Sequence, residues 1–216
     1  IYPFIKPIPA VFKNNDQPPQ YDVCIGASHI HDRKGQWRVV EALAEIKKQH
    51  ARNLSAVLPG GQYGGVNSGA IPAIINRHGL NITTPGMVSR RQMINIYNIS
   101  KVFVKAGAHG QNDRGVLEAL LCGCVPVLAG NNRHPVFINK WFSENIFSST
   151  ATATELGSVL LTTVDSWTRG NRSWAAMIAD GNNGFDLAEE SFSSLVSHMI
   201  DHPDPDINYL RGVYGL

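Results

Sequence analysis

The segment KVFVKAGAHGQNDRGVLEALLCGCVPVLAG, residues 101–130, contains two mainly apolar runs that are separated by a polar, glycine-rich loop and a helical pattern. The runs at 101–107 and 125–130 are typical of strands that are covered on both faces of a parallel sheet. Residues 114–123 predict a helix between them. A strand, a helix and a second strand in this order form a βαβ unit, so the segment predicts a parallel α/β sheet.

The same alternation extends from this segment toward both ends of the chain. Further strands are predicted at 21–28, 54–61, 80–86 and 144–149, and further helices at 36–49, 68–79, 89–100, 152–164, 172–180 and 186–201. Two of the helices open with a capping box, Ser89 with Gln92 and Thr152 with Glu155. The sequence therefore predicts a doubly wound, Rossmann-like α/β fold with about six parallel strands and helices on both faces.

We divide the chain of 216 residues into a linker and one domain. Residues 1–20 are rich in proline and end in a polar stretch, which predicts a linker that docks on the domain. Residues 21–216 are predicted to form one Rossmann-like domain, with the C-terminal helices of 152–201 packing on it. The chain begins with Ile rather than Met, which suggests that it is cut from a longer protein.

Composition argues against several classes of function. The formal net charge is +2, which is too close to neutral to predict binding to nucleic acid or to a membrane surface. No apolar run reaches membrane-spanning length and no signal peptide is visible, so we expect a cytoplasmic protein. Cys24, Cys122 and Cys124 lie in apolar surroundings, and we interpret them as core residues rather than as a disulfide or zinc set. We predict no metal site.

In open parallel sheets, ligands bind beyond the carboxyl ends of the strands. Loop 105–115 leaves such an end, is rich in glycine and precedes a helix, so its N–H groups and the helix dipole favour a phosphate. The alternative is that its glycines only form a tight turn. Loop 28–35, SHIHDRKG, is either a solvated basic turn or a contact for a diphosphate.

Glu118 is a carboxylate in an otherwise apolar helical segment. It is either exposed to solvent near the helix N-terminus or it faces the cleft and accepts hydrogen bonds from the vicinal hydroxyls of a sugar. Other catalytic patterns fail, because the chain has no Gly-x-Ser-x-Gly motif and no cysteine in polar surroundings beside a histidine base.

Four stretches of the chain carry a resemblance to a known family. They are CIGASHIHDRKGQWRVVEALAEI at 24–46, AVLPGGQYGG at 56–65, ITTPGMVSRRQMINIYNISKVFV at 82–104 and LEALLCGCVPVLAG at 117–130. In this order they resemble the C-terminal, donor-binding domain of GT-B fold retaining glycosyltransferases of family 4. The collinear match covers roughly 21–130, and its last stretch is the most specific.

The resemblance implies one half of a GT-B fold and a set of donor-binding residues. The set is His29, Arg33, Lys34, Gly61, Met87, Val88, Gly110, Gly115, Val116 and Glu118. By the resemblance, Glu118 binds the ribose hydroxyls of the donor nucleotide and Lys34 neutralises its diphosphate. The amides at the start of the helix, at 115–116, lie near the phosphates, and the turn 87–88 borders the base.

The chain departs from the family pattern at several positions. His29 stands where the family has an arginine, and a histidine is not reliably charged at neutral pH. Gly110 stands where the family has the first glutamate of its Glu-x7-Glu motif, near the donor sugar. We expect His109 or Asp113 to take its place as the catalytic group.

The resemblance implies a hexosyltransferase that uses a nucleotide sugar, a sugar or glycoconjugate acceptor and no cofactor or metal, with retention of configuration. It also implies an N-terminal GT-B domain that this chain lacks, so the chain alone binds donor without turnover. Two alternatives stay open: a nucleotide- or sugar-binding module that has lost catalysis, and half of a GT-B-like UDP-sugar 2-epimerase. An NAD-binding Rossmann domain is disfavoured, because GASHIHDRKG lacks the glycine fingerprint.

Overall fold

The computed structural model describes residues 11–26, 29–61, 63–107, 114–129 and 146–167. Within these ranges the main feature is a parallel sheet of six strands in the order β5-β3-β1-β6-β7-β8. The strands are β1 (Tyr21–Ile25), β3 (Ala56–Pro59), β5 (Ile82–Gly86), β6 (Ser100–Lys105), β7 (Val125–Ala129) and β8 (Ile146–Phe147). The strand order reverses at β1, which makes β1 and β6 the switch point of a doubly wound sheet and confirms the predicted fold class.

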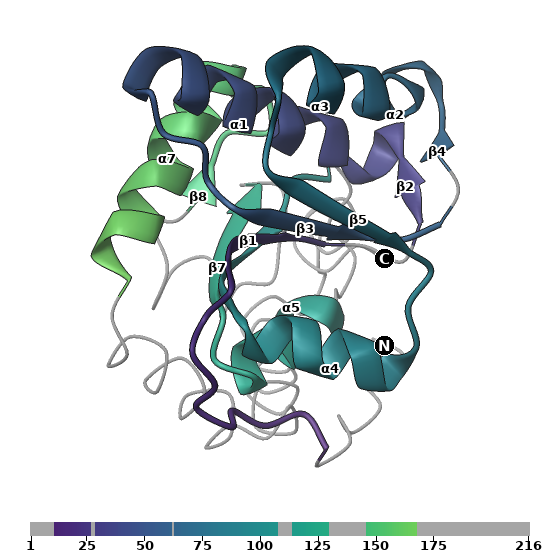
Figure 1. Cartoon of the computed structure of the whole chain (residues 1–216), viewed down its shortest axis with the longest axis vertical. Helices are drawn as coiled ribbons and strands as arrows, with labels where there is room; N and C mark the ends of the chain where they lie inside the picture. Colours follow the sequence, from purple (N-terminus) through teal and green to yellow (C-terminus); the bar gives the residue numbers. More distant parts are fainter. Residues whose placement is uncertain (1–10, 27–28, 62, 108–113, 130–145, 168–216) are drawn as a thin grey trace, which may run out of the picture.

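Helices cover both faces of the sheet (Figure 1). One layer contains α1 (Gln36–His50), α2 (Val66–Gly69), α3 (Ile71–His78) and α7 (Ala153–Ser166), and the other contains α4 (Arg90–Asn98) and α5 (Arg114–Leu121). The predicted capping boxes open α4 and α7, where Ser89 and Thr152 each accept a hydrogen bond from the third residue of the helix.

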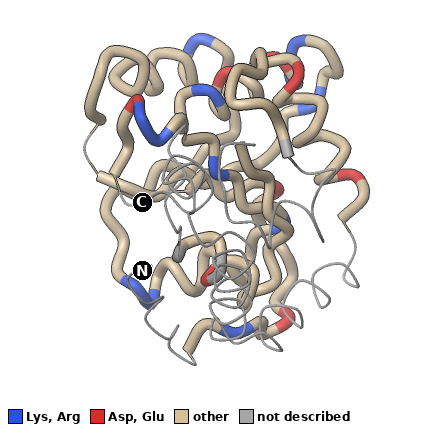
Figure 2. The backbone as a smooth tube through the Cα atoms, turned by 180° about the vertical axis from the view of Figure 1, so that it is seen from behind, with Lys and Arg blue, Asp and Glu red and all other residues tan. Residues whose placement is uncertain are grey.

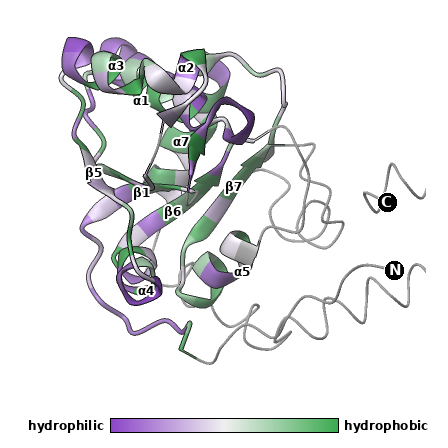
Figure 3. Cartoon of the chain, turned by 90° about the vertical axis from the view of Figure 1, so that its right-hand side faces the viewer, coloured by the Kyte–Doolittle hydropathy of each residue, from purple (hydrophilic) through white to green (hydrophobic). Residues whose placement is uncertain are grey.

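The strands separate two hydrophobic cores because successive side chains point to opposite faces. In β1, Val23 and Ile25 pack in the core beneath α1 and α7, whereas Cys24 packs with α4 and α5. Both cores reach full burial at the central strands, and β7 is hydrophobic along most of its length (Figure 3). The continuous apolar runs in the sequence follow from this burial on two sides.

Two local features differ from the sequence expectation. The helix predicted at 68–79 is two helices, α2 and α3, and the second begins around Pro72, which has no N–H to continue the first. The polar turn predicted at 28–35 contains β2 (Ile30–His31) and the 3₁₀ helix η1 (Asp32–Lys34). β2 pairs in parallel with β4 (Tyr63–Gly64) to form a separate two-stranded sheet.

Residues 11–20 pass beside the C-terminal end of α4. Phe12 is buried, and the backbone N–H of Asn15 donates to Oδ1 of Asn98 over 2.8 Å. Nδ2 of Asn98 donates to the carbonyl of Lys13 over 3.1 Å, so the last residue of α4 binds this segment through both ends of its amide. The helices predicted at 172–180 and 186–201 lie outside the described residues.

The described residues carry basic and acidic side chains that are scattered over the fold, without a face of one sign (Figure 2). None of the helices in the described ranges is long and apolar enough to span a bilayer. Cys24, Cys122 and Cys124 are buried and form no disulfide, which confirms them as core residues. Burial raises the pKa of the Cys24 thiol far above its ordinary value.

Candidate functional site

A cleft of about 400 Å³ opens at the carboxyl edge of the sheet, on the side of α4 and α5. Its walls come from the residues that follow β1 and β3, from the turn between β5 and α4, and from the start of α5. They are Phe12, Gly26, Pro59, Gly60, Met87, Val88, Ser89, Arg90, Met93, Tyr97, Phe103, Gly115 and Glu118. This is the switch-point position at which doubly wound sheets bind ligands.

Glu118 reaches the cleft because of its register on α5. Gly115 and Glu118 are three residues apart and therefore share one face of the helix, which lines the cleft. Val116 and Ala119 face the other way and are buried in the core. The glutamate is half-buried, so its carboxylate is presented to the cleft from an apolar helix.

The floor of the cleft is apolar and aromatic. The rings of Tyr97 and Phe103 pack edge to face, with their centroids 5.6 Å apart and an interplanar angle of 80°. Gly26, at the end of β1, makes room for this floor, because a Cβ atom there would collide with the Phe103 ring. Apolar and aromatic lining of this kind is usual in pockets that bind small molecules.

Four of the donor-binding residues predicted from the sequence line this cleft in the structure: Met87, Val88, Gly115 and Glu118. Gly61 lies beside it, since a Cβ atom on Gly61 would stand 2.6 Å from Cγ of Met87. Val116 contributes a buried side chain behind the wall. The predicted residues His109, Gly110 and Asp113 lie outside the described residues.

The basic turn is not part of the cleft wall. The side chains of His29, Arg33 and Lys34 are exposed and do not line the cleft. The backbone of the turn nevertheless packs on the loop that follows β6, because a Cβ atom on Gly107 would stand 3.1 Å from the Arg33 carbonyl oxygen and 3.2 Å from Cα of Lys34. The turn therefore borders Gly107, at the end of the described residues that follow β6.

Asp32 fixes the other side of this turn. Its carboxylate accepts hydrogen bonds from the backbone N–H of Ser68 over 2.6 Å and of Asn67 over 3.3 Å, at the start of α2. The hydrogen bond from the Ser68 N–H is the main cause that holds the pKa of Asp32 below its ordinary value, and the one from Asn67 acts in the same direction. Together with the β2–β4 pair, the carboxylate joins the loop after β3 to the basic turn.

Gln36 is a buried amide that braces the same turn from inside. Its Nε2 donates to the carbonyl of His29 over 3.0 Å and to that of Gly26 over 3.4 Å, and its Oε1 accepts from the N–H of His31 over 3.4 Å. The side chain is 1% exposed. Sequence reasoning treated Gln36 only as the first residue of a helix, and it gave no role to Phe12, Arg90 or the aromatic floor.

Among the described side chains, no group of three or more His, Cys, Asp or Glu residues lies close enough to hold a metal ion.

Comparison with known proteins gives matches in structure and none in sequence. No protein-family profile matches the chain, and no curated protein matches it. The C-terminal domain of LpcC, a glycosyl transferase group 1 family protein from Francisella tularensis, is similar with a TM-score of 0.62 at 18% identity, over 84% of this chain and 96% of that one. The catalytic domain of the cholesterol-alpha-glucosyltransferase from Helicobacter pylori gives 0.56 at 16% identity, over 81% and 99%.

A third similar structure is a longer protein. HepE from Anabaena, solved in complex with UDP and glucose, has a TM-score of 0.63 at 18% identity, over 82% of this chain and 48% of its own. The chain thus spans almost all of the two isolated domains and about half of this longer protein. Its fold is the C-terminal, Rossmann-like half of a GT-B fold, as the sequence resemblance implied.

Proposed function

We propose that the chain is the donor-binding part of a glycosyltransferase, which transfers a hexose from a nucleoside diphosphate sugar to a sugar or glycoconjugate acceptor with retention. The observation that carries the proposal is the position of Glu118, which lines a cleft at the switch point of a GT-B half beside the start of α5. HepE, which shares this fold, was solved with UDP and glucose, which supports the same class of ligand here.

The proposed binding mode follows from the chemistry of the cleft walls. The Glu118 carboxylate accepts hydrogen bonds from the two ribose hydroxyls, which are vicinal donors. The diphosphate lies toward the first turn of α5, where the backbone at Gly115 and Val116 and the positive end of the helix dipole favour negative charge. The base lies against the turn formed by Met87 and Val88.

In the proposed reaction, the bond between the anomeric carbon of the sugar and the diphosphate oxygen breaks, and negative charge builds on the departing diphosphate. The acceptor hydroxyl oxygen bonds to that carbon on the same face, and its proton passes to the departing diphosphate. The start of α5 and the cations Arg33 and Lys34 stabilise that charge. The basic turn is suited to this role because Asp32 and Gln36 fix its backbone from two sides. The acceptor and its binding groups are proposed to lie on a further, N-terminal domain, since longer similar proteins are about twice the length.

A second candidate function is a nucleotide-binding module without catalysis. It is favoured by Gly110, which stands where the family has a glutamate near the donor sugar. Both candidates predict nucleotide binding at Glu118, and transfer of the sugar by the complete protein separates them.

The test is calorimetric titration of the chain with UDP, GDP and ADP. At least one is expected to bind, and Glu118→Ala is expected to weaken that binding by about 1–3 kcal/mol, because the ribose hydroxyls lose their acceptor. The matched control is Glu45→Ala, on α1, where the carboxylate contacts Lys48 and Gln49 and is far from the cleft in sequence and layer. Absence of binding to all three nucleotides, or equal binding by Glu118→Ala, contradicts the proposal.

A further inference from the structure

The α4 side of the cleft carries a cation that the predicted donor-binding set does not include. Arg90 is the first residue of α4 and lines the cleft. Its guanidinium carbon lies 5.9 Å from the centre of the Phe12 ring, and Phe12 is only 3% exposed. A guanidinium over an aromatic ring is attracted by the ring face, and its N–H groups remain able to donate hydrogen bonds to a ligand.

The donors of Arg90 are uncommitted within the described part of the chain. There the side chain forms neither an ion pair nor a hydrogen bond, and its contact is with the Phe12 ring. The neighbouring Ser89 hydroxyl is occupied, because it donates to Oε1 of Gln92 over 2.9 Å and accepts from the Gln92 N–H over 3.3 Å. Arg90 is therefore the polar side chain on this wall that can recognise a ligand.

The surrounding wall fits the flat faces of a nucleobase. Met87 and Val88 border the cleft beside Arg90, and Met93 continues the apolar surface along α4. The cleft volume of about 400 Å³ is within the usual range for sites of small molecules. Since Glu118 lines the same cleft from α5, one nucleoside can meet both residues, with its ribose toward the glutamate and its base toward the arginine.

We propose that Arg90 selects nucleobases with an oxo group at position 4 of a pyrimidine or position 6 of a purine, which are uracil, guanine and hypoxanthine. This inference rests on the proposed function, which places the base on this wall. An arginine offers donors and no acceptor, so it pairs with an oxo oxygen. Cytosine and adenine carry an amino group there, which points its own donors at the guanidinium and leaves both groups unpaired.

The test uses two pairs of nucleotides that differ mainly in this group, UDP against CDP and IDP against ADP, titrated calorimetrically into the full chain. The wild type is expected to bind UDP and IDP roughly tenfold or more tightly than CDP and ADP. Arg90→Ala is expected to reduce both ratios to less than about threefold, and Arg90→Gln, which retains an amide donor, to leave part of the preference.

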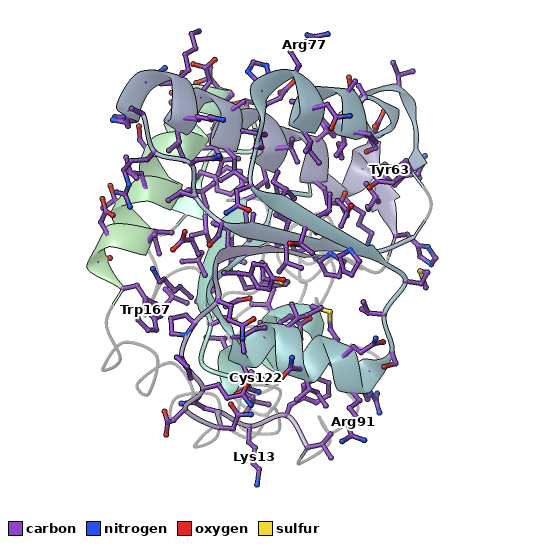
Figure 4. All side chains as sticks on the ribbon, viewed as in Figure 1. Lys13, Tyr63, Arg77, Arg91, Cys122 and Trp167 are labelled. Atoms are coloured by element: carbon purple, nitrogen blue, oxygen red, sulfur yellow. The ribbon has the colours of Figure 1, made fainter. Side chains whose placement is uncertain are left out.

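Arg91→Ala is the matched control, because Arg91 is the next residue of α4 and does not line the cleft. Its side chain lies on the side of the helix that faces away from the sheet (Figure 4), so this variant is expected to keep both ratios. A wild type that binds oxo and amino nucleotides equally, or an Arg90→Ala variant that keeps the preference, overturns the inference and leaves the proposed function standing. A chain that binds none of the four nucleotides overturns both.

Discussion

Asp22 lies in the first half of the central strand β1 and links three segments that are distant in sequence. Its Oδ1 accepts a hydrogen bond from Nζ of Lys101 over 2.7 Å, and its Oδ2 accepts from the N–H and hydroxyl of Ser55 over 2.9 and 3.0 Å. Burial acts to raise the pKa of Asp22, and the hydrogen bonds from Lys101 and Ser55 outweigh it, so the net pKa lies below the ordinary value of 3.8.

A lowered pKa in the folded state makes stability depend on pH. The contribution of Asp22 is fully present above the ordinary pKa of 3.8 and is lost as the pH falls through the lower pKa of the folded protein. We expect Asp22→Asn to reduce the free energy of unfolding by about 1 kcal/mol at pH 7 and by less at pH 2.5, as measured by urea denaturation at both values. An equal loss at both pH values contradicts this account of the carboxylate.

Single residues of the site differ in how far the sequence could predict them. Glu118 was singled out through the family resemblance, because its local pattern alone also allowed a solvent-exposed residue near a helix N-terminus. The contribution of Phe12 to the cleft could not be predicted from the sequence. Phe12 lies in a proline-rich segment that is tied to α4 by the hydrogen bond from the N–H of Asn15 to Asn98, 83 residues later. Arg90 had a local signal, because it stands two residues after Val88 in the Met87–Val88 turn.

The turn between β1 and α1 shows how backbone geometry positions an element. Gly35 ends η1 with φ at 70°, which is the left-handed region that glycine tolerates best. A Cβ atom there would also collide with the carbonyl group of Ala106. The absence of a side chain at residue 35 therefore allows the close contact between the basic turn and the residues that follow β6.

This contact yields a prediction with an internal control. Gly35→Ala is expected to cost the left-handed penalty of about 1–2 kcal/mol and a further 1–3 kcal/mol for the collision, and to weaken nucleotide binding. Gly86→Ala shares a positive φ, 73°, but its Cβ atom would meet nothing within 4 Å, so it is expected to cost only the first amount. Equal losses of unfolding free energy in the two variants would show that the contact with Ala106 is unimportant.

Elements with strong periodicity or caps were predictable, and those held together by distant groups were not. The capping boxes of α4 and α7 predict where these helices begin, because each is formed by two residues three positions apart in the sequence. The strands β2 and β4 have two residues each, which is too short for any periodicity. Their pairing is supported by Asp32, whose carboxylate reaches residues 35 and 36 positions later in the chain.

At the scale of the whole molecule, the alternation of strands and helices in the sequence predicted the doubly wound sheet. The order of the strands was not predicted, although the right-handed crossovers between parallel strands limit the arrangements available. The same order places the ends of β1, β3 and the start of α5 around one cleft. Sequence reasoning located this edge of the sheet, whereas the packing of Tyr97 against Phe103 in the lining of the cleft has no local pattern in the sequence.

The central claim is that the cleft beside Glu118 holds the nucleotide of a sugar donor. A crystal structure of the chain with its tightest-binding nucleoside diphosphate tests it most directly. The account predicts ribose hydroxyls within about 3 Å of the Glu118 carboxylate, the diphosphate at the first turn of α5 and the base against Met87 and Val88. A nucleotide bound elsewhere on the chain, or one in this cleft whose ribose does not meet Glu118, contradicts it.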